Sequence, residues 1–318
     1  MRPYRHLDEI FRTAERIPFD DASKFILMSD CHRGDGSQAD EFFRNENLYL
    51  TAMNRYFEEG YTYIELGDGD ELWENKKMSD IIQAHPDSFR VLKRFWRAKR
   101  LYFLYGNHDM VKKEPGYAEE NLYHFRDSRA GKEQSLFENV RIREGLVLTY
   151  QGSGKKAAGS SILLIHGHQA DILNNTFWKL ARLLVRYFWK PLELFGISDP
   201  TSPAQNQEKK EKVSRRLARW AARENRMLIA GHTHRPMFPE TEEPMYFNDG
   251  SCVHPLFITG IEIAGGKITL VKWSVKAGAE GILYVGRDIL AGPVRLEDFF
   301  YAKKVMETCS YRDPSMEI

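Results

Sequence analysis

The chain has 318 residues, of which 42% are hydrophobic and 29% are charged, and its formal net charge is +1. This is ordinary globular composition, and it gives no global field that would attract nucleic acid or acidic substrates. Cys31, Cys252 and Cys309 are widely spaced and form no CxxC pair, which favours a reducing compartment over a disulfide framework. With no apolar signal-peptide stretch and no uncharged run of about 18 residues, we expect a cytoplasmic protein. Peripheral attachment to the inner face of the membrane stays open.

Short apolar runs at 24–28, 61–66 and 101–105 predict three buried strands in the first half of the chain. Helical patterns at 40–59 and 79–99 separate these runs; Phe43, Leu48, Leu50, Met53 and Phe57 are the candidate core residues of the first helix. Strand, helix, strand, helix, strand predicts an α/β sheet with crossover helices.

The second half of the chain has more antiparallel character. Runs at 161–165 and 227–230 predict two more strands, and the runs 257–263 and 267–273 flank Ala264-Gly265-Gly266, a hairpin signal. Residues 171–226 are expected to form a helical insertion, and 246–318 a β-rich and helical C-terminal extension. We expect one domain that spans residues 1–318.

The ends of five predicted strands carry the residues that are informative about function. The motifs are, in chain order, Ser29-Asp30-Cys31-His32, Gly67-Asp68-Gly69-Asp70-Glu71, Gly106-Asn107-His108-Asp109, His166-Gly167-His168 and Gly231-His232-Thr233-His234. Ligand sites of open α/β sheets form at the carboxyl ends of the strands. Six of the ten histidines lie in these motifs, so the sequence predicts one polar site at this edge.

Imidazole and carboxylate groups suit manganese, iron and zinc better than softer metals. Asp30 and His32 are two residues apart and are expected to lie close together on a strand-end turn, whereas His232 and His234, with the same separation, can reach two neighbouring metals. One carboxylate must bridge the metals, and Asp68 in a glycine-flanked turn suits that position. We expect two divalent metal ions about 3.5–4 Å apart. Manganese is the first choice, with iron and zinc as alternatives.

In this order, the motifs resemble those of the calcineurin-like metallophosphoesterases. The resemblance runs from about Asp30 to His234 and implies a four-layer α/β/β/α metallophosphoesterase sandwich with a helical insertion. It implies that Asp30, His32, Asp68 and His234 hold one metal, and that Asp68, Asn107, His166 and His232 hold the other. It also implies that His108 is the acid beside the leaving group, oriented by Asp109.

Two departures from the family pattern narrow the choice of subfamily. Glu71 stands where the Gly-Asp-x-x-Asp motif ends in Asp, and Leu72 and Tyr105 stand where protein Ser/Thr phosphatases have the arginines that fork onto a phosphate. Gly67 to Trp73 is instead similar to the UDP-2,3-diacylglucosamine pyrophosphohydrolases, which also carry a helical insertion after His-Gly. That resemblance is partial, since those enzymes usually have Arg at the position of His108 and Asp at that of His168.

The insertion begins with an amphipathic stretch at 171–196. Lys179, Arg182, Arg186 and Lys190 form a basic stripe, and Trp178 lies among the aromatic and aliphatic residues of another face. Such a helix can lie among lipid headgroups or grip an acyl chain, and it can equally pack on the core or on a homodimer partner. The candidate substrate contacts are Arg33, His168, Trp178, Arg182 and Arg186.

The sequence therefore predicts a dimetal-dependent hydrolase of a phosphate ester or a pyrophosphate bond, acting through a metal-bridging hydroxide. Its substrate is a phosphorylated small molecule or lipid, with lipid-linked and nucleotide-diphosphate compounds as candidates. A phosphodiesterase or nuclease of the same superfamily is the alternative enzyme, although the net charge of +1 gives nucleic acid little support. A scaffold without catalysis would have lost ligands, and every ligand position is filled.

Overall fold

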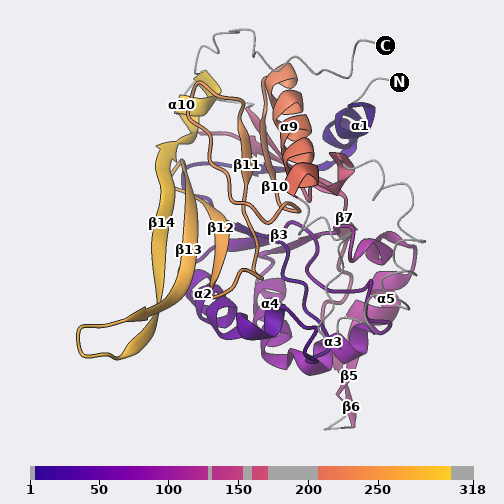
Figure 1. The fold of residues 1–318 in the computed structure, drawn as a ribbon. Coiled ribbons are helices and arrows are strands. Elements are labelled where there is room, and N and C mark those ends of the chain that lie inside the picture. Colours follow the sequence, from indigo (N-terminus) through magenta and orange to yellow (C-terminus); the bar gives the residue numbers. More distant parts are fainter. Residues whose placement is uncertain (1–3, 128–130, 153–159, 171–206, 302–318) are drawn as a thin grey trace.

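The computed structural model describes residues 4–127, 131–152, 160–170 and 207–301. Within these residues, two mixed sheets lie against one another and helices cover their outer faces (Figure 1). The expected four-layer α/β/β/α arrangement is confirmed. The core of the domain is correspondingly divided into three apolar layers, one between the sheets and one beneath each set of helices.

The larger sheet has seven strands and combines a parallel half with an antiparallel half. Its order is β14 (Leu283–Arg295), β13 (Lys267–Ala277), β12 (Phe257–Ala264), β2 (Lys24–Met28), β3 (Thr62–Glu65), β4 (Leu101–Leu104) and β7 (Ile142–Arg143). The strands from β2 to β7 are parallel, and β12 joins β2 in the antiparallel sense. The predicted hairpin is confirmed, since Gly265 and Gly266, both at positive φ, connect β12 to β13.

The smaller sheet has five strands. Its order is β1 (Glu15–Phe19), β8 (Gly145–Tyr150), β9 (Ser161–Ile165), β10 (Met227–Ala230) and β11 (Tyr246–Asn248). Only the β8–β9 pair is antiparallel. The runs 161–165 and 227–230 are therefore strands, as predicted, and both are wholly buried.

Helices pack on the outer face of each sheet. Those on the larger sheet are α2 (Glu46–Glu58), α3 (Met78–Ala84) and α4 (Pro86–Arg97); those on the smaller sheet are α1 (Arg5–Thr13) and α9 (Gln207–Glu224). The remaining elements are short: η1 (Phe42–Arg44), η2 (Met110–Lys113), η3 (His168–Ala170), α5 (Tyr117–Leu122), α10 (Leu296–Tyr301) and a hairpin of β5 (His124–Asp127) and β6 (Lys132–Ser135).

The two helices predicted in the first half differ from the observed ones. The pattern at 79–99 is two helices, because Pro86 has no N–H to donate to the preceding turn and begins α4 instead. The pattern at 40–59 resolves into η1 and α2. Leu48 and Met53 are buried as predicted, but the side chain of Phe43 in η1 is 60% exposed, so its assignment to the core was wrong.

Of the predicted helical insertion at 171–226, the structure describes the C-terminal part, which contains α9. Residues 171–206 lie outside the described residues. The expected C-terminal extension contains β11 to β14 and α10, and 302–318 again lie outside the description. Among the helices that the structure describes, none has the length and apolar character needed to cross a membrane.

Candidate dimetal centre

The loops that follow β2, β3, β4, β9 and β10 meet at one edge of the sandwich. Backbone hydrogen bonds tie neighbouring loops together: the N–H of Asp30 donates to Gly67, that of His32 to Asp68, and that of Gly231 to His166, over 2.9–3.0 Å. These bonds fix the relative positions of loops that are far apart in sequence. The side chains of the five motifs consequently converge.

The backbone of these loops is strained in a consistent way. Nine non-glycine residues of the described chain have positive φ, and five of them belong to the motifs: Asp30, His32, Asp68, His232 and His234, at 47–68°. A left-handed residue of this kind costs on the order of 1–3 kcal/mol and persists only where the surroundings impose it. Their concentration at one edge is typical of a functional site.

Two motif glycines are required by close approach. A Cβ on Gly106 would lie 2.1 Å from Asp68 Oδ1, and a Cβ on Gly231 would lie 2.0 Å from Ser29 Oγ. Either side chain would push a carboxylate-bearing loop out of place. The glycines therefore serve the packing of the loops rather than a turn alone.

One group of potential ligands combines Asp30, His32 and His234. Asp30 Oδ1 lies 3.0 Å from His234 Nε2 and 3.7 Å from His32 Nε2. Donor atoms that share one ion at about 2.0–2.2 Å lie roughly 3–4 Å from one another. The spacing within this group fits a single cation.

A second group combines Asp68, His166 and His232, whose ligand atoms lie within 4.8 Å of one another. Asp68 Oδ2 is 3.1 Å from His166 Nε2 and also 3.9 Å from His32 Nε2 of the first group. Its other oxygen accepts the backbone N–H of His108 over 2.7 Å. One oxygen of Asp68 therefore faces both groups.

Several buried polar atoms at this edge have no hydrogen-bond partner among the described residues. They include Asp30 Oδ1, the Nε2 atoms of His32, His166 and His232 and both amide atoms of Asn107. Because buried polar atoms are nearly always satisfied, such a cluster indicates a missing partner, and imidazole, carboxylate and amide donors suit manganese, iron or zinc. The residues present fit a pair of divalent cations.

The electrostatics of the centre favour added positive charge. Burial opposes ionisation of Asp30, yet His234 and His166 hold the pKa of this carboxyl well below its usual range. Burial likewise opposes protonation of His166, but Asp68 and Asp30 raise its pKa to about 9. Two buried carboxylates thus draw in either protons or a cation.

Residues outside the motifs hold the ligands in place. His166 Nδ1 lies 3.1 Å from the carbonyl of Leu66, which turns Nε2 toward the centre. The Ser29 hydroxyl lies within hydrogen-bonding distance of both Asp30 and Asp249. Burial and the nearby Asp30 raise the pKa of the Asp249 carboxyl well above its usual range, and the Ser29 hydroxyl links the two carboxyl groups. Asp249 carried no motif signal in the sequence.

The comparison with protein families agrees with this geometry. The family model described as calcineurin-like phosphoesterase matches residues 23–236, which is more than half of the chain. The chain belongs to the calcineurin-like phosphoesterase family. No curated protein matches the sequence.

The solved structures that are similar to this member of the family include two of Vps29 from Chaetomium thermophilum. The first is 12% identical, covers 85% of this chain and 97% of that chain, and has a TM-score of 0.39. The second is Vps29 complexed with a RaPID-derived cyclic peptide, at 11% identity, 85% and 96% coverage and a TM-score of 0.34.

The expectation that Asp109 orients His108 is wrong. Asp109 instead accepts the N–H of Gly106 and the ammonium of Lys112, each over 2.6 Å. Glu71 Oε2 lies 2.7 Å from His108 Nδ1 and 2.8 Å from His32 Nδ1, so one carboxylate oxygen serves both imidazoles. Burial opposes ionisation of Glu71, but His108 and His32 lower its pKa to about 2.

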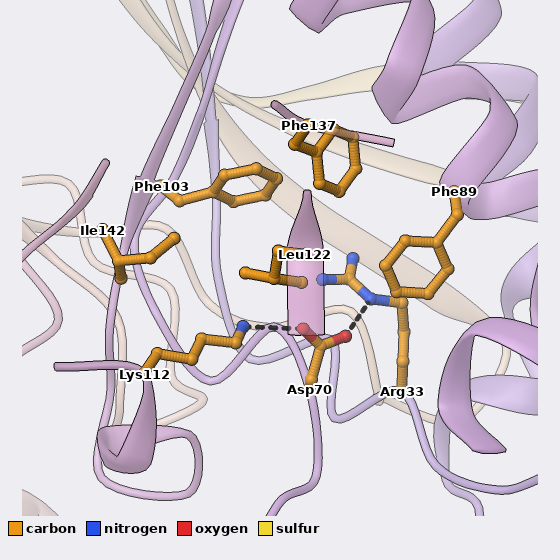
Figure 2. A pocket seen from close by; sticks show the side chains of 8 residues that line it. All are labelled: Arg33, Asp70, Phe89, Phe103, Lys112, Leu122, Phe137 and Ile142. Carbon is orange, nitrogen blue, oxygen red and sulfur yellow. Dashed lines mark hydrogen bonds and ion pairs between the residues drawn. The ribbon is translucent and has the colours of Figure 1, made fainter. Parts of the chain in front are cut away.

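Arg33 does not reach the substrate side of the centre, contrary to expectation. Its guanidinium is fully buried, forms a bidentate pair with Glu65 at 2.8 Å and bonds Asp70 through Nε at 2.7 Å. Lys112 reaches Asp70 from the other side at 2.6 Å, beside a small pocket with apolar walls (Figure 2). Arg33 therefore stabilises the loop that carries Asp68.

The other candidate substrate contacts have different outcomes. His168 is fully buried and lies beside His166, with ring centroids 5.4 Å apart, and neither ring nitrogen has a hydrogen-bond partner among the described residues. Burial first, and then His166, lowers its pKa well below the usual range, so it is neutral. Trp178, Arg182 and Arg186 lie outside the described residues.

The burial of Arg33 predicts a structural role. Arg33→Ala leaves Glu65 buried without its bidentate partner and Asp70 with Lys112 alone, which should lower the free energy of unfolding by about 3–5 kcal/mol. The matched control is Arg90→Ala, which removes an exposed ion pair with Asp87 and should cost less than about 1 kcal/mol. Denaturant titration measures both. Unchanged stability together with a raised KM in Arg33→Ala would contradict this role and would support Arg33 as a substrate contact.

Asp68 should control metal binding at both positions. Asp68→Asn keeps the size of the side chain but removes the charge shared by the two groups, so we expect purified protein to lose most of its metal. Elemental analysis and the shift of Tm on adding Mn²⁺ measure this, with Asp87→Asn on the exposed face of α4 as the control. Two retained metal equivalents in Asp68→Asn would contradict the shared-ligand arrangement.

Proposed function

We propose that the protein is a dimetal phosphoesterase that hydrolyses a phosphate ester or a pyrophosphate bond. The observation that carries this proposal is the position of Asp68 Oδ2 between two groups of buried donors. In the proposed assignment, Asp30, His32, Asp68 and His234 hold one cation, and Asp68, Asn107, His166 and His232 hold the other. When bound, such a pair supplies an activated water and neutralises charge on the phosphoryl group.

His108 is the residue that we assign to protonation of the leaving group. Its side chain is 18% exposed, whereas those of His32 and His166 are 8% and 0% exposed, so it lies nearer the surface of the centre. Glu71 occupies Nδ1, which leaves Nε2 to meet a departing oxygen. Trp73 stacks on the imidazole, with ring centroids 4.3 Å apart, and limits its rotation.

The first test is an activity screen with added Mn²⁺, Fe²⁺ or Zn²⁺ on phosphomonoesters, phosphodiesters, nucleotide-diphosphate lipids and phosphopeptides. Metal-dependent turnover of one class, lost in Asp68→Asn, supports the proposal. Turnover restricted to phosphodiesters or nucleic acid would favour the alternative enzyme. A folded protein that binds two metals and cleaves no substrate class would favour the scaffold.

Loss of His108 should depend on the leaving group. His108→Gln is expected to reduce kcat by roughly 10²–10⁴ on an alkyl phosphate ester, because an alkoxide needs a proton to depart. The same variant should lose much less on a nitrophenyl ester, whose leaving group departs without one. Glu71→Gln should show the same contrast in weaker form. Equal losses on both esters would make His108 a ligand or a structural residue.

For the substrate, we propose a lipid-linked or nucleotide-diphosphate compound. The sequence supports this through the likeness of residues Gly67 to Trp73 to the UDP-2,3-diacylglucosamine pyrophosphohydrolases and through the basic, aromatic pattern of 171–196. The described residues on either side of 171–206 add support. Ala170 lies two residues after His168, and its carbonyl accepts a hydrogen bond of 2.9 Å from Arg216 of α9. The last described residue before the segment therefore contacts α9, the helix that follows the segment.

Substitutions in the insertion should separate substrate choice from chemistry. Trp178→Ala, Phe188→Ala and Trp189→Ala together remove apolar surface that would contact acyl chains, so turnover of a lipid-linked substrate should fall sharply. Hydrolysis of a small nitrophenyl ester should remain near that of the wild type. An equal loss of both activities would contradict a role of the insertion in substrate choice alone. Loss of folding or of a dimer would indicate that the segment packs on the core or on a partner subunit.

A further inference from the structure

The outer edge of the larger sheet is formed by a long strand, β14, with no described partner strand on its outer side. β14 has 13 residues and pairs with β13 on one side only. Figure 1 shows the strand at the open side of the sandwich, with the β13–β14 connection projecting past α2. Natural edge strands usually carry protection against pairing, such as bulges, proline or charged residues.

The two halves of β14 differ in this protection. Its C-terminal half contains register shifts opposite Leu270 and the Gly292-Pro293 bond, which break regular pairing. The stretch from Leu283 to Ile289 pairs with β13 in unbroken register and contains no proline. The regular stretch has seven residues, and Gly286 is at its centre.

The exposed side chains of this stretch are apolar. Leu283, Tyr284 and Ile289 are 69%, 52% and 50% exposed. The two charged residues between them are already neutralised within the chain. Arg287 forms a bidentate pair with Glu262 at 2.6–2.7 Å, and Asp288 is paired with Lys276. An apolar edge without free charge favours another strand over solvent.

We propose that β14 pairs with β14 of a second copy of this chain, antiparallel about a two-fold axis through Gly286. In an antiparallel pair, residues directly opposite each other lie on the same face, so a symmetric register must be centred on one residue. Centring at Gly286 sets Leu283 opposite Ile289 of the other copy, and Tyr284 opposite Asp288. Both are compatible pairs, and no like charges meet.

The neighbouring registers are worse. Centring at Arg287 or at Asp288 would set identical charges opposite each other on the axis. Centring at Val285 would set Leu283 opposite Arg287 and run Ile289 beyond the start of the strand. Gly286 on the axis, by contrast, adds no side chain where the two strands approach most closely. Sequence and strand regularity therefore select the same register.

Charge exchange across the axis tests both the dimer and its register. Wild-type protein is expected to be a dimer by light scattering on a size-exclusion column. Leu283→Lys places a charge against Ile289 of the other copy and should raise the dissociation constant at least about tenfold, equivalent to 1.4 kcal/mol. Adding Ile289→Glu to the same chain should restore dimerisation, because each introduced lysine then faces an introduced glutamate.

A cross-link gives an independent readout. Gly286→Cys should form an interchain disulfide under mild oxidation, since the two residues meet on the axis; an added Cβ there meets only the flexible side chain of Lys276. Tyr284→Cys is the control, because its two copies would lie about 13 Å apart. Wild-type protein measures any background from its own cysteines.

A monomeric wild-type protein would overturn the proposal. A dimer that is insensitive to Leu283→Lys, or that cross-links equally well through Tyr284→Cys, would also overturn it. Circular dichroism of each variant separates loss of the dimer from loss of the fold. The exposed positions of Leu283 and Ile289 make folding of the variants the expected result.

Discussion

The carboxylate of Asp68 is the contact on which the candidate centre depends. One oxygen accepts the N–H of His108 and so joins the loop after β4 to the loop after β3. The other oxygen faces imidazoles from the loops after β2 and β9. The two loops approach so closely that position 106 has no room for a side chain, and the backbone of Asp68 adopts a positive φ. Geometry and charge at the centre are therefore set by the same side chain.

The features that sequence alone predicted are those that depend on local order along the chain. Each buried strand is a short apolar run. The polar residues directly after a strand lie at the edge of the sheet, and this placement depends only on their position after the strand. This is why Asp30, His166 and His232 could be placed at one edge before the structure was known. The family match covers residues 23–236, a range that contains all five strand-end motifs.

What the sequence left undecided is which way each polar side chain points after its strand. Arg33 follows a motif directly, yet its side chain turns beneath the centre. There it forms a buried bidentate ion pair with Glu65 and a single ion pair with Asp70. Asp109 follows His108 but bonds Lys112, while Glu71, 37 residues earlier, reaches the imidazole. These choices depend on the third dimension. No spacing in the sequence distinguishes the two carboxylates.

The same orientations constrain how a phosphate could be held. The positions where Ser/Thr phosphatases have arginines are Leu72 and Tyr105, and both side chains are buried. Arg33, the third candidate, is engaged beneath the centre. In the described framework none of these positions offers a guanidinium fork, so under the proposed function the phosphoryl group would be held mainly by cations at the two ligand groups. Discrimination between substrates would then arise from groups that surround the centre, and changes there should act on KM more than on kcat.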